Sequence, residues 1–198
     1  SLKAKYAGRL MNHSADSLFR HRIELIPNCG HSIDYSLTTP WLKTYKRNPY
    51  PHTLMWEDYP MDGQRRQGFY NLYVMKRPKA ADGLKDASGE DRDYYEMDIK
   101  DNVIRLSVKK VTYQTLERDP VYGIDLKFTK SYHPVSGGKW KIYLNDQLVD
   151  MNRPVTVFIN DRKAFEGKLV PRMEDMITSC MEYFDPCRVF PASVDVAL

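Results

Sequence analysis

His31 is the residue of this sequence best placed to do chemistry. It lies in the stretch 28–34, Asn-Cys-Gly-His-Ser-Ile-Asp, which follows an expected strand at 21–26 and Pro27. A histidine on a short glycine-containing loop can act as a general base, because its unperturbed pKa lies near neutrality. We therefore take His31 as the candidate catalytic residue.

The partners that such a histidine needs are harder to find. A general-base histidine deprotonates a hydroxyl, and a carboxylate fixes its tautomer. None of the nearby serines stands in a G-x-S-x-G motif; these are Ser14, Ser17, Ser32 and Ser36. Asp34 could serve as the carboxylate only in an unusual geometry. Cys29 is too close to His31 in sequence to form the usual pair of nucleophile and base with it. The alternative is that His31 is an ordinary loop histidine of a complete small protein.

The cysteines suggest neither a metal site nor a disulfide framework. Cys29, Cys180 and Cys187 have no familiar ligand spacing. A bridge between Cys180 and Cys187 is one interpretation. Free thiols are favoured, because Cys180 falls on the apolar face of an expected helix and Cys187 in a loop. We expect no metal and no other cofactor.

The composition is that of a globular chain with a mixed surface. The 198 residues allow one substantial core, or one domain and part of another. Hydrophobic residues make up 42% and the 14 tyrosines favour β structure. The net charge is +4, with basic residues interleaved among acidic ones, so we expect no nucleic-acid partner. The sequence shows no signal peptide and no membrane span.

The first 50 residues read as helix, strand and helix. Small and apolar residues recur at three- and four-residue spacing over 2–18, which predicts a helix. A short strand at 21–26 follows. A Thr before Pro40 then starts a second helix, expected over 38–45. Pro49 and Pro51 impose extended backbone after it.

From His52 onward the pattern is that of successive strands. Alternating apolar and polar residues predict strands at 53–58, 68–75, 94–100, 103–111, 123–129, 139–144, 154–159, 164–170 and near the end at 194–198. Turns are expected at 60–63 and at 160–163, where the latter closes a hairpin. Residues 76–93 are expected to form a long surface loop. We predict a mainly-β domain, an immunoglobulin-like antiparallel β-sandwich.

One amphipathic helix is expected near the C-terminus. Pro171 suits its first turn, and Glu174 and Asp175 complement its N-terminus. Its apolar residues fall on one stripe, which consists of Met173, Met176, Ile177, Cys180, Met181 and Phe184. We expect this stripe to cap the sandwich core.

Three stretches around His31 carry a resemblance: 30–34 (GHSID), 40–42 (PWL) and 47–51 (RNPYP). In this order they resemble the C-terminal end of a bacterial α/β-hydrolase of the prolyl-oligopeptidase-like or esterase-like kind. The resemblance implies that His31 is the catalytic histidine of a serine hydrolase. It places the nucleophile, the acid and the oxyanion hole upstream of residue 1. Residues 1–50 would be the C-terminal remnant of the hydrolase domain, inactive alone.

Residues 51–198 resemble a β-rich domain appended to such hydrolases, on the stretches 142–146 (IYLND), 153–157 (RPVTV), 165–168 (FEGK) and 185–192. That resemblance predicts the fold of this region and assigns no chemical activity to it. The implied partner is the missing N-terminal part of the hydrolase domain, and a homo-oligomer stays open. A bacterial periplasmic or secreted location is favoured over a cytoplasmic one.

A second function competes with the hydrolase. The β-sandwich would be a non-catalytic module that binds carbohydrate through aromatic stacking or mediates oligomerisation. Its candidate residues are Trp56, Tyr70, Tyr73, Tyr94, Tyr95, Tyr113 and Trp140. At least half of them are expected in the core, because they alternate within strands.

Overall fold

The computed structural model describes residues 35–61, 63–81 and 92–198. The chain divides between Arg47 and Asn48 into two compact units. In the first, helix α2 spans Thr38–Lys43. It begins where the sequence predicted and ends two residues earlier, because the N–H groups of Thr44 and Tyr45 bond in a tighter last turn. The helix expected at 2–18 and the strand at 21–26 lie outside the described residues.

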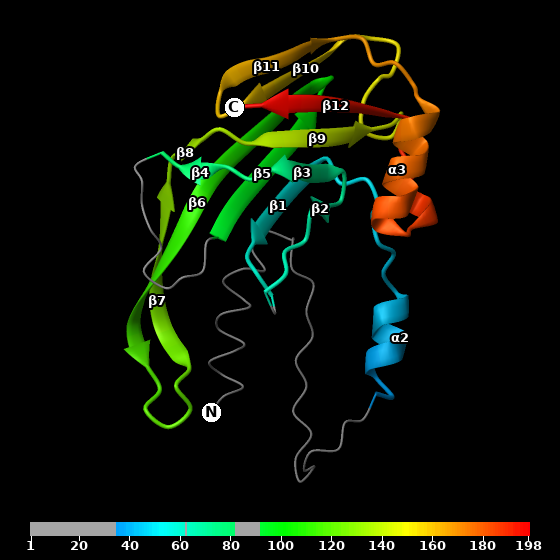
Figure 1. Ribbon diagram of the computed structural model, residues 1–198. Coiled ribbons are helices and arrows are strands. Elements are labelled where there is room, and N and C mark those ends of the chain that lie inside the picture. The colour runs from blue at the N-terminus through cyan, green and yellow to red at the C-terminus, as the bar shows by residue number, and fades with distance from the viewer. Residues whose placement is uncertain (1–34, 62, 82–91) are drawn as a thin grey trace. The chain divides into compact units, whose positions relative to one another are not determined.

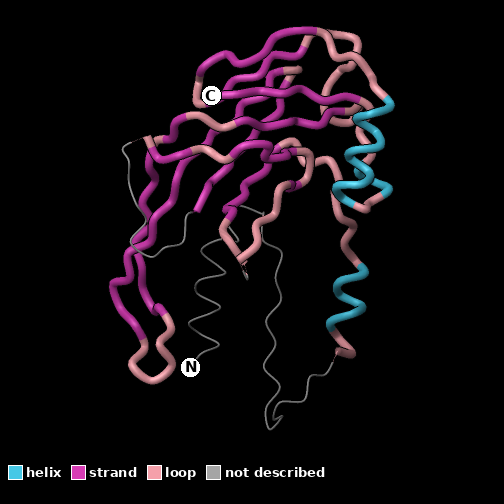
Figure 2. The backbone as a smooth tube through the Cα atoms, in the orientation of Figure 1, coloured by secondary structure: helices cyan, strands magenta, loops and turns pink. Residues whose placement is uncertain are grey.

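The second unit is mainly β (Figures 1 and 2). Its largest sheet has six strands in the order β1 (Thr53–Asp58), β5 (Arg92–Lys100), β6 (Val103–Arg118), β10 (Val155–Ile159) and β11 (Arg162–Gly167), with β7 (Asp125–His133) beside β6. A second sheet has the order β12 (Ala192–Ala197), β9 (Lys139–Leu144), β3 (Leu72–Lys76) and β2 (Gly68–Phe69). A two-stranded sheet pairs β4 (Lys79–Ala80) with β8 (Val135–Ser136).

Neighbouring strands run antiparallel except β6 and β10, which are parallel. The chain reaches β10 from β6 by way of β7, β8 and β9, so this pairing joins segments far apart in sequence. Strand β6 is the longest of the described strands and pairs with β5, β10 and β7 along its length. It is therefore the centre of the larger sheet.

The two large sheets enclose one hydrophobic core, and the strands of the smaller sheet run across those of the larger one (Figure 1). Aromatic rings join the layers: Tyr95 of β5 lies edge-on to Trp140 of β9, with centroids 6.4 Å apart. Trp56 of β1 stacks on Phe69 of β2 at 5.5 Å. The predicted mainly-β fold with antiparallel sheets and a C-terminal helix is thus confirmed. The immunoglobulin-like topology stays a prediction.

Several strand predictions need correction, and one of them is β11, which spans Arg162–Gly167 instead of 164–170. Residues 68–75 form a tight hairpin of β2 and β3 instead of one strand, since Tyr70 has a φ of 51° and Asn71 is buried in the turn. The Asn71 side chain donates to the Tyr143 carbonyl at 3.0 Å, which fixes that turn on β9. Strand β6 continues seven residues past the expected 111, and its partner β7 ends at His133 instead of 129.

The C-terminal helix α3 spans Met173–Tyr183, and a short 3-10 helix follows at Pro186–Arg188. Pro171 precedes the helix instead of entering it, because Arg172 is still extended and donates its N–H to Pro191. The orientation predicted for α3 is wrong. Its buried residues are Asp175 and Ser179, and its apolar stripe faces solvent.

Candidate functional site

His31, the residue predicted to do chemistry, lies outside the described residues, as do Cys29, Ser32 and Asp34. Ser36 is described and is exposed. The predicted free thiols Cys180 and Cys187 are indeed free, and both are exposed. The candidate site described below is therefore built from residues of the β-rich unit.

The structure divides the aromatic candidates between the two sides of the sheets. Trp56, Tyr95 and Trp140 are buried at 8%, 0% and 0% exposure, so they are core residues and cannot stack on a ligand. Tyr70 and Tyr73 pack against the same core. The remaining pair, Tyr94 and Tyr113, lies half-buried on the other side of the larger sheet. This outer side, away from the smaller sheet, is where an aromatic site is available.

Four aromatic side chains gather on that outer side around Lys130. Tyr113 lies directly opposite Lys130 in the β6–β7 register. The Lys130 ammonium lies 5.1, 5.6 and 5.3 Å from the ring centroids of Tyr94, Tyr113 and Tyr132. Phe128 contacts Tyr113 edge-on at 5.1 Å. Cation–π attraction and ring contacts hold this group together.

Glu57 of β1 supplies the negative charge that pairs with Lys130 in this aromatic group. It accepts hydrogen bonds from the Tyr113 hydroxyl at 2.8 and 2.9 Å and from Lys130. Burial would raise the pKa of the Glu57 carboxyl, but the bonds from Lys130 and Tyr113 outweigh it and hold this pKa below its usual range. Burial would lower the pKa of Lys130, but the bond to Glu57 raises it above its usual value. The pair is ionised at neutral pH, so neither group is suited to proton transfer there.

An open groove of about 640 Å³ continues along the same outer side. Tyr132, which is 48% exposed, lies at one end, and Phe158 of β10 lines the groove as well. Between these rings the floor carries alternating polar side chains, which are Glu96, Asp98, Arg105, Ser107 and Lys109. The strand register sets Glu96 opposite Ser107, and Asp98 opposite Arg105, so acceptors and donors lie next to one another.

The wall beside Phe158 is built by the turn between β10 and β11. Asn160 and Asp161 have φ values of 45° and 63°, as a two-residue hairpin turn requires. The Asn160 amide accepts from the Val108 N–H at 2.8 Å and donates to the Val108 carbonyl at 3.1 Å. The turn that the sequence predicted is therefore anchored on β6, and it places Asp161 at the groove.

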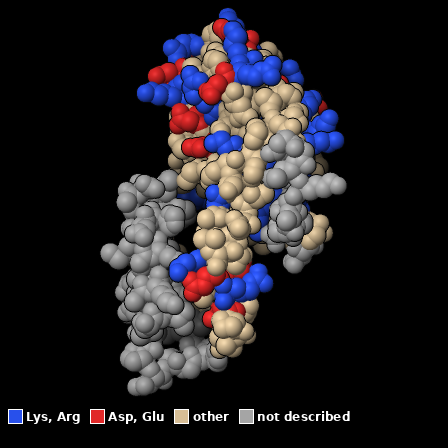
Figure 3. Space-filling model, turned by 90° about the vertical axis from the view of Figure 1, so that its left-hand side faces the viewer, with Lys and Arg blue, Asp and Glu red and all other residues tan. Residues whose placement is uncertain are grey.

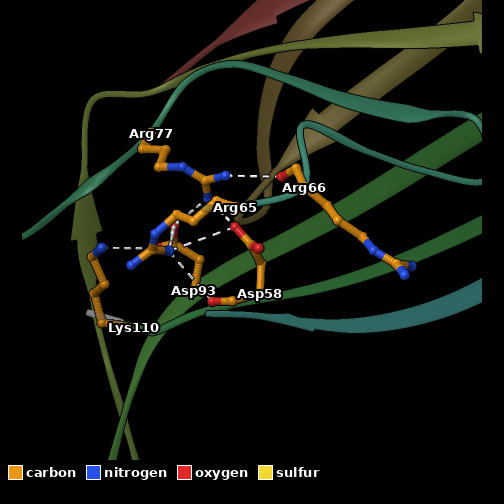
Figure 4. A network of polar contacts seen from close by, with 6 residues as sticks. All are labelled: Asp58, Arg65, Arg66, Arg77, Asp93 and Lys110. Carbon is orange, nitrogen blue, oxygen red and sulfur yellow. Dashed lines mark hydrogen bonds and ion pairs between the residues drawn. The ribbon is translucent and has the colours of Figure 1, made fainter. Parts of the chain in front are cut away.

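A second polar cluster lies on the inner side of the same strands (Figure 4). Asp58, Asp93 and Lys110 stand side by side across β1, β5 and β6. Lys110 lies 2.6 Å from Asp93, while Arg77 bonds both carboxylates and Arg65 approaches both, at 3.5 and 3.6 Å. Both acids are almost fully buried, at 2% and 0% exposure.

This buried ion network holds parts of the fold together and is not a ligand site. Arg77 also donates to the Arg66 carbonyl at 2.9 Å, so the network ties the segment between β1 and β2 to the end of β3. Burial raises the pKa of Asp58, and the ion pairs with Arg77 and Arg65 offset only part of that effect. The cations surround both carboxylates, as buried charges require.

The described part of the chain holds no cluster of three or more His, Cys, Asp or Glu side chains that would suit a metal ion. Within the same residues, none of the helices has the length and hydrophobicity needed to cross a bilayer.

Comparison of the chain with protein families, curated proteins and solved structures finds no match.

Replacement of Asp93 tests whether the buried ion network is structural. In Asp93→Asn the Lys110 ammonium and the Arg77 guanidinium lose a buried counter-charge, so we expect a loss of about 3 kcal/mol in the free energy of unfolding. Glu96→Gln on the exposed side of the same strand is the matched control, with an expected change within about 0.5 kcal/mol. Urea denaturation measures both, and equal effects of the two variants would contradict this role.

Glu57 has a distinct pH signature. Its pKa is lower in the folded than in the unfolded protein. The ionised form therefore adds stability above the unfolded-state pKa, and this stability is lost as pH falls through the folded-state pKa. We expect Glu57→Gln to be less stable than the unmodified protein at pH 7 and the difference to shrink below about pH 4.5. A difference that stays constant from pH 7 to pH 3 in denaturation curves would refute this assignment.

Proposed function

We propose that residues 48–198 form a non-catalytic binding module whose ligand lies in the outer groove of the six-stranded sheet. The observation that carries the proposal is the combination, in one open groove, of the exposed Tyr132 ring with a row of charged and hydroxyl side chains. Ligand sites typically pair apolar surface with a few oriented polar groups. The Lys130 and Lys109 ammonium groups lie 5.3 and 5.4 Å from the Tyr132 ring centroid, and these contacts orient the ring.

A neutral carbohydrate is the ligand class that best suits this groove. Sugars present apolar C–H faces to aromatic rings, and their hydroxyls both donate and accept. The groove supplies carboxylate acceptors from Glu96 and Asp98 and cationic donors from Arg105 and Lys109. The mixture of both signs does not favour a polyanion such as nucleic acid, which needs a basic stripe.

The surface charge agrees with a neutral ligand. Figure 3 shows one face of the molecule, on which Lys and Arg lie beside Asp and Glu both near the top and at the foot of the view. At the foot, on the β6–β7 hairpin, Arg118 pairs with Asp125 and Lys127 with Glu117. Such pairing balances the charges at the tip of this hairpin.

The test is titration of the full chain with neutral oligosaccharides, namely cellohexaose, xylohexaose and maltohexaose, followed by calorimetry. We expect at least one of these oligosaccharides to bind with a submillimolar Kd, which corresponds to a favourable binding free energy of more than about 4 kcal/mol. Tyr132→Ala should weaken that binding at least about tenfold. Tyr122→Ala removes a ring that is more exposed, at 77%, and lies at the tip of the β6–β7 hairpin; it is the control and should bind normally. Equal weakening by both variants, or no binding of any of the three, would refute the proposal.

We also propose that the chain derives from a serine hydrolase in which His31 is the general base. The sequence resemblance of residues 30–51 supports this second candidate, with the preceding part of the hydrolase domain as its partner. The chain carries no G-x-S-x-G motif, so it should hydrolyse no ester alone.

Esterase assays with p-nitrophenyl acetate and p-nitrophenyl butyrate separate this second candidate from the binding module. We expect no turnover above background by this chain, and activity in a longer chain that carries a serine elbow. His31→Ala should lower that activity about a thousandfold or more. His52→Ala, which replaces an exposed histidine of the β-rich unit, is the control and should leave it unchanged. Esterase activity of the present chain, or full activity of His31→Ala, would rule out the assignment.

A further inference from the structure

Helix α3 turns its apolar side toward solvent. Five of the large side chains on its stripe are exposed, at 71% for Met173, 38% for Met176, 52% for Ile177, 65% for Met181 and 89% for Phe184. Cys180, which lies among them, is exposed as well. An apolar patch of this size on a folded unit marks an interaction site, because exposing it to water is unfavourable.

Specific hydrogen bonds on the opposite side of α3 fix this orientation. The Ser193 hydroxyl of β12 donates to the Asp175 carboxylate at 2.7 Å. The Phe190 N–H donates to the Ser179 hydroxyl at 3.0 Å. Both acceptors are buried, so rotating the helix to bury its stripe would leave polar groups unpaired. The outward stripe is therefore the stable arrangement of the helix.

Phe184 extends the stripe at the C-terminal end of α3. It ends the helix with a φ of 46°, a conformation that is uncommon for a bulky residue, and its ring is nearly fully exposed. Residues at the C-terminal end of a helix often adopt this conformation, and the Phe184 N–H bonds to the Cys180 carbonyl at 2.9 Å. Phe184 therefore continues the apolar stripe beyond the last turn of α3.

The charges of α3 do not suit a membrane surface as the partner. The helix contains Glu174, Asp175 and Glu182 and has no lysine or arginine between Met173 and Tyr183. Anionic lipid would repel such a helix, whereas basic residues favour it. A flat apolar stripe without charge is instead suited to a copy of itself, since a twofold axis brings no like charges together on it.

The exposed area is also sufficient for such a contact. At about 200 Å² for a fully exposed large side chain, the five residues present roughly 600 Å² per copy. Two copies would bury roughly 1,200 Å², which is at the lower end of specific interfaces. Methionine side chains adapt their shape readily and so pack well in such a seam.

We propose that two copies of this chain associate through α3, with the two helices antiparallel about a twofold axis. The apolar stripes of the two copies bury one another. The antiparallel arrangement sets the opposite ends of the helix dipoles side by side. The axis passes near the middle of the stripe, between Ile177 and Cys180. The dimer is independent of the groove ligand, because the stripe and the groove share no residue.

Analytical ultracentrifugation of the full chain between about 5 and 300 µM tests the association. We expect a reversible dimer with a Kd of roughly 1–100 µM, as an interface of this size allows. Ile177→Glu should weaken it at least about a hundredfold while leaving the circular dichroism unchanged, and also the melting temperature at concentrations below the Kd, since Ile177 is exposed. Val121→Glu replaces another exposed apolar residue, at the hairpin tip, and should dimerise normally. A monomer at 300 µM, or equal effects of the two variants, would overturn the proposal.

Cross-linking tests the antiparallel geometry. With Cys29 and Cys187 replaced by serine, the short bismaleimide reagent bismaleimidoethane should join Cys180 of the two copies efficiently. With Cys29 and Cys180 replaced instead, Cys187 should cross-link poorly, because an antiparallel pair sets the two helix ends far apart. Efficient cross-linking through Cys187 and not through Cys180 would overturn the antiparallel arrangement.

Discussion

The buried ion network of Asp58, Asp93, Lys110 and Arg77 is the interaction on which the rest of the β-rich unit depends. Two carboxylates this deeply buried are tolerated only with their counter-ions in place. The acids and the lysine come from three adjacent strands, so the network requires their register. Arg77 follows β3 of the smaller sheet, so it also ties that sheet to the larger one. Strand pairing and the relation between the sheets are thereby fixed together.

The same register determines what the outer side of the sheet offers. Side chains alternate along a strand, so with Asp58 and Asp93 inside, Glu57 and Tyr94 must lie outside. Lys130 joins Glu57 to three tyrosine rings there, and the groove extends from Tyr132 along the strands. A register shift of one residue would exchange the two sides of a strand and destroy both networks. The candidate site is thus a consequence of how the core is held together.

Helix α3 shows how a correct local pattern leads to a wrong tertiary prediction. Its stripe is a true amphipathic pattern, and a stripe normally faces the core. At this place, however, the rim of the smaller sheet presents the Ser193 hydroxyl and the Phe190 N–H. Those groups need acceptors, and Asp175 and Ser179 supply them. The polar side of the helix therefore docks, and the apolar side remains for a partner.

The sequence by itself determined the local elements, namely the alternating strands β1, β9 and β10, the Asn160–Asp161 turn and the existence of α3, because these follow from periodicity and turn chemistry. It also singled out His31, whose role stays a prediction. Only the tertiary structure decided which aromatic residues are available, since Tyr94 and Tyr95 alternate in one strand and no local pattern says which side meets the other sheet. The groove likewise required the parallel pairing of β6 and β10, a contact between distant segments that no short-range signal encodes.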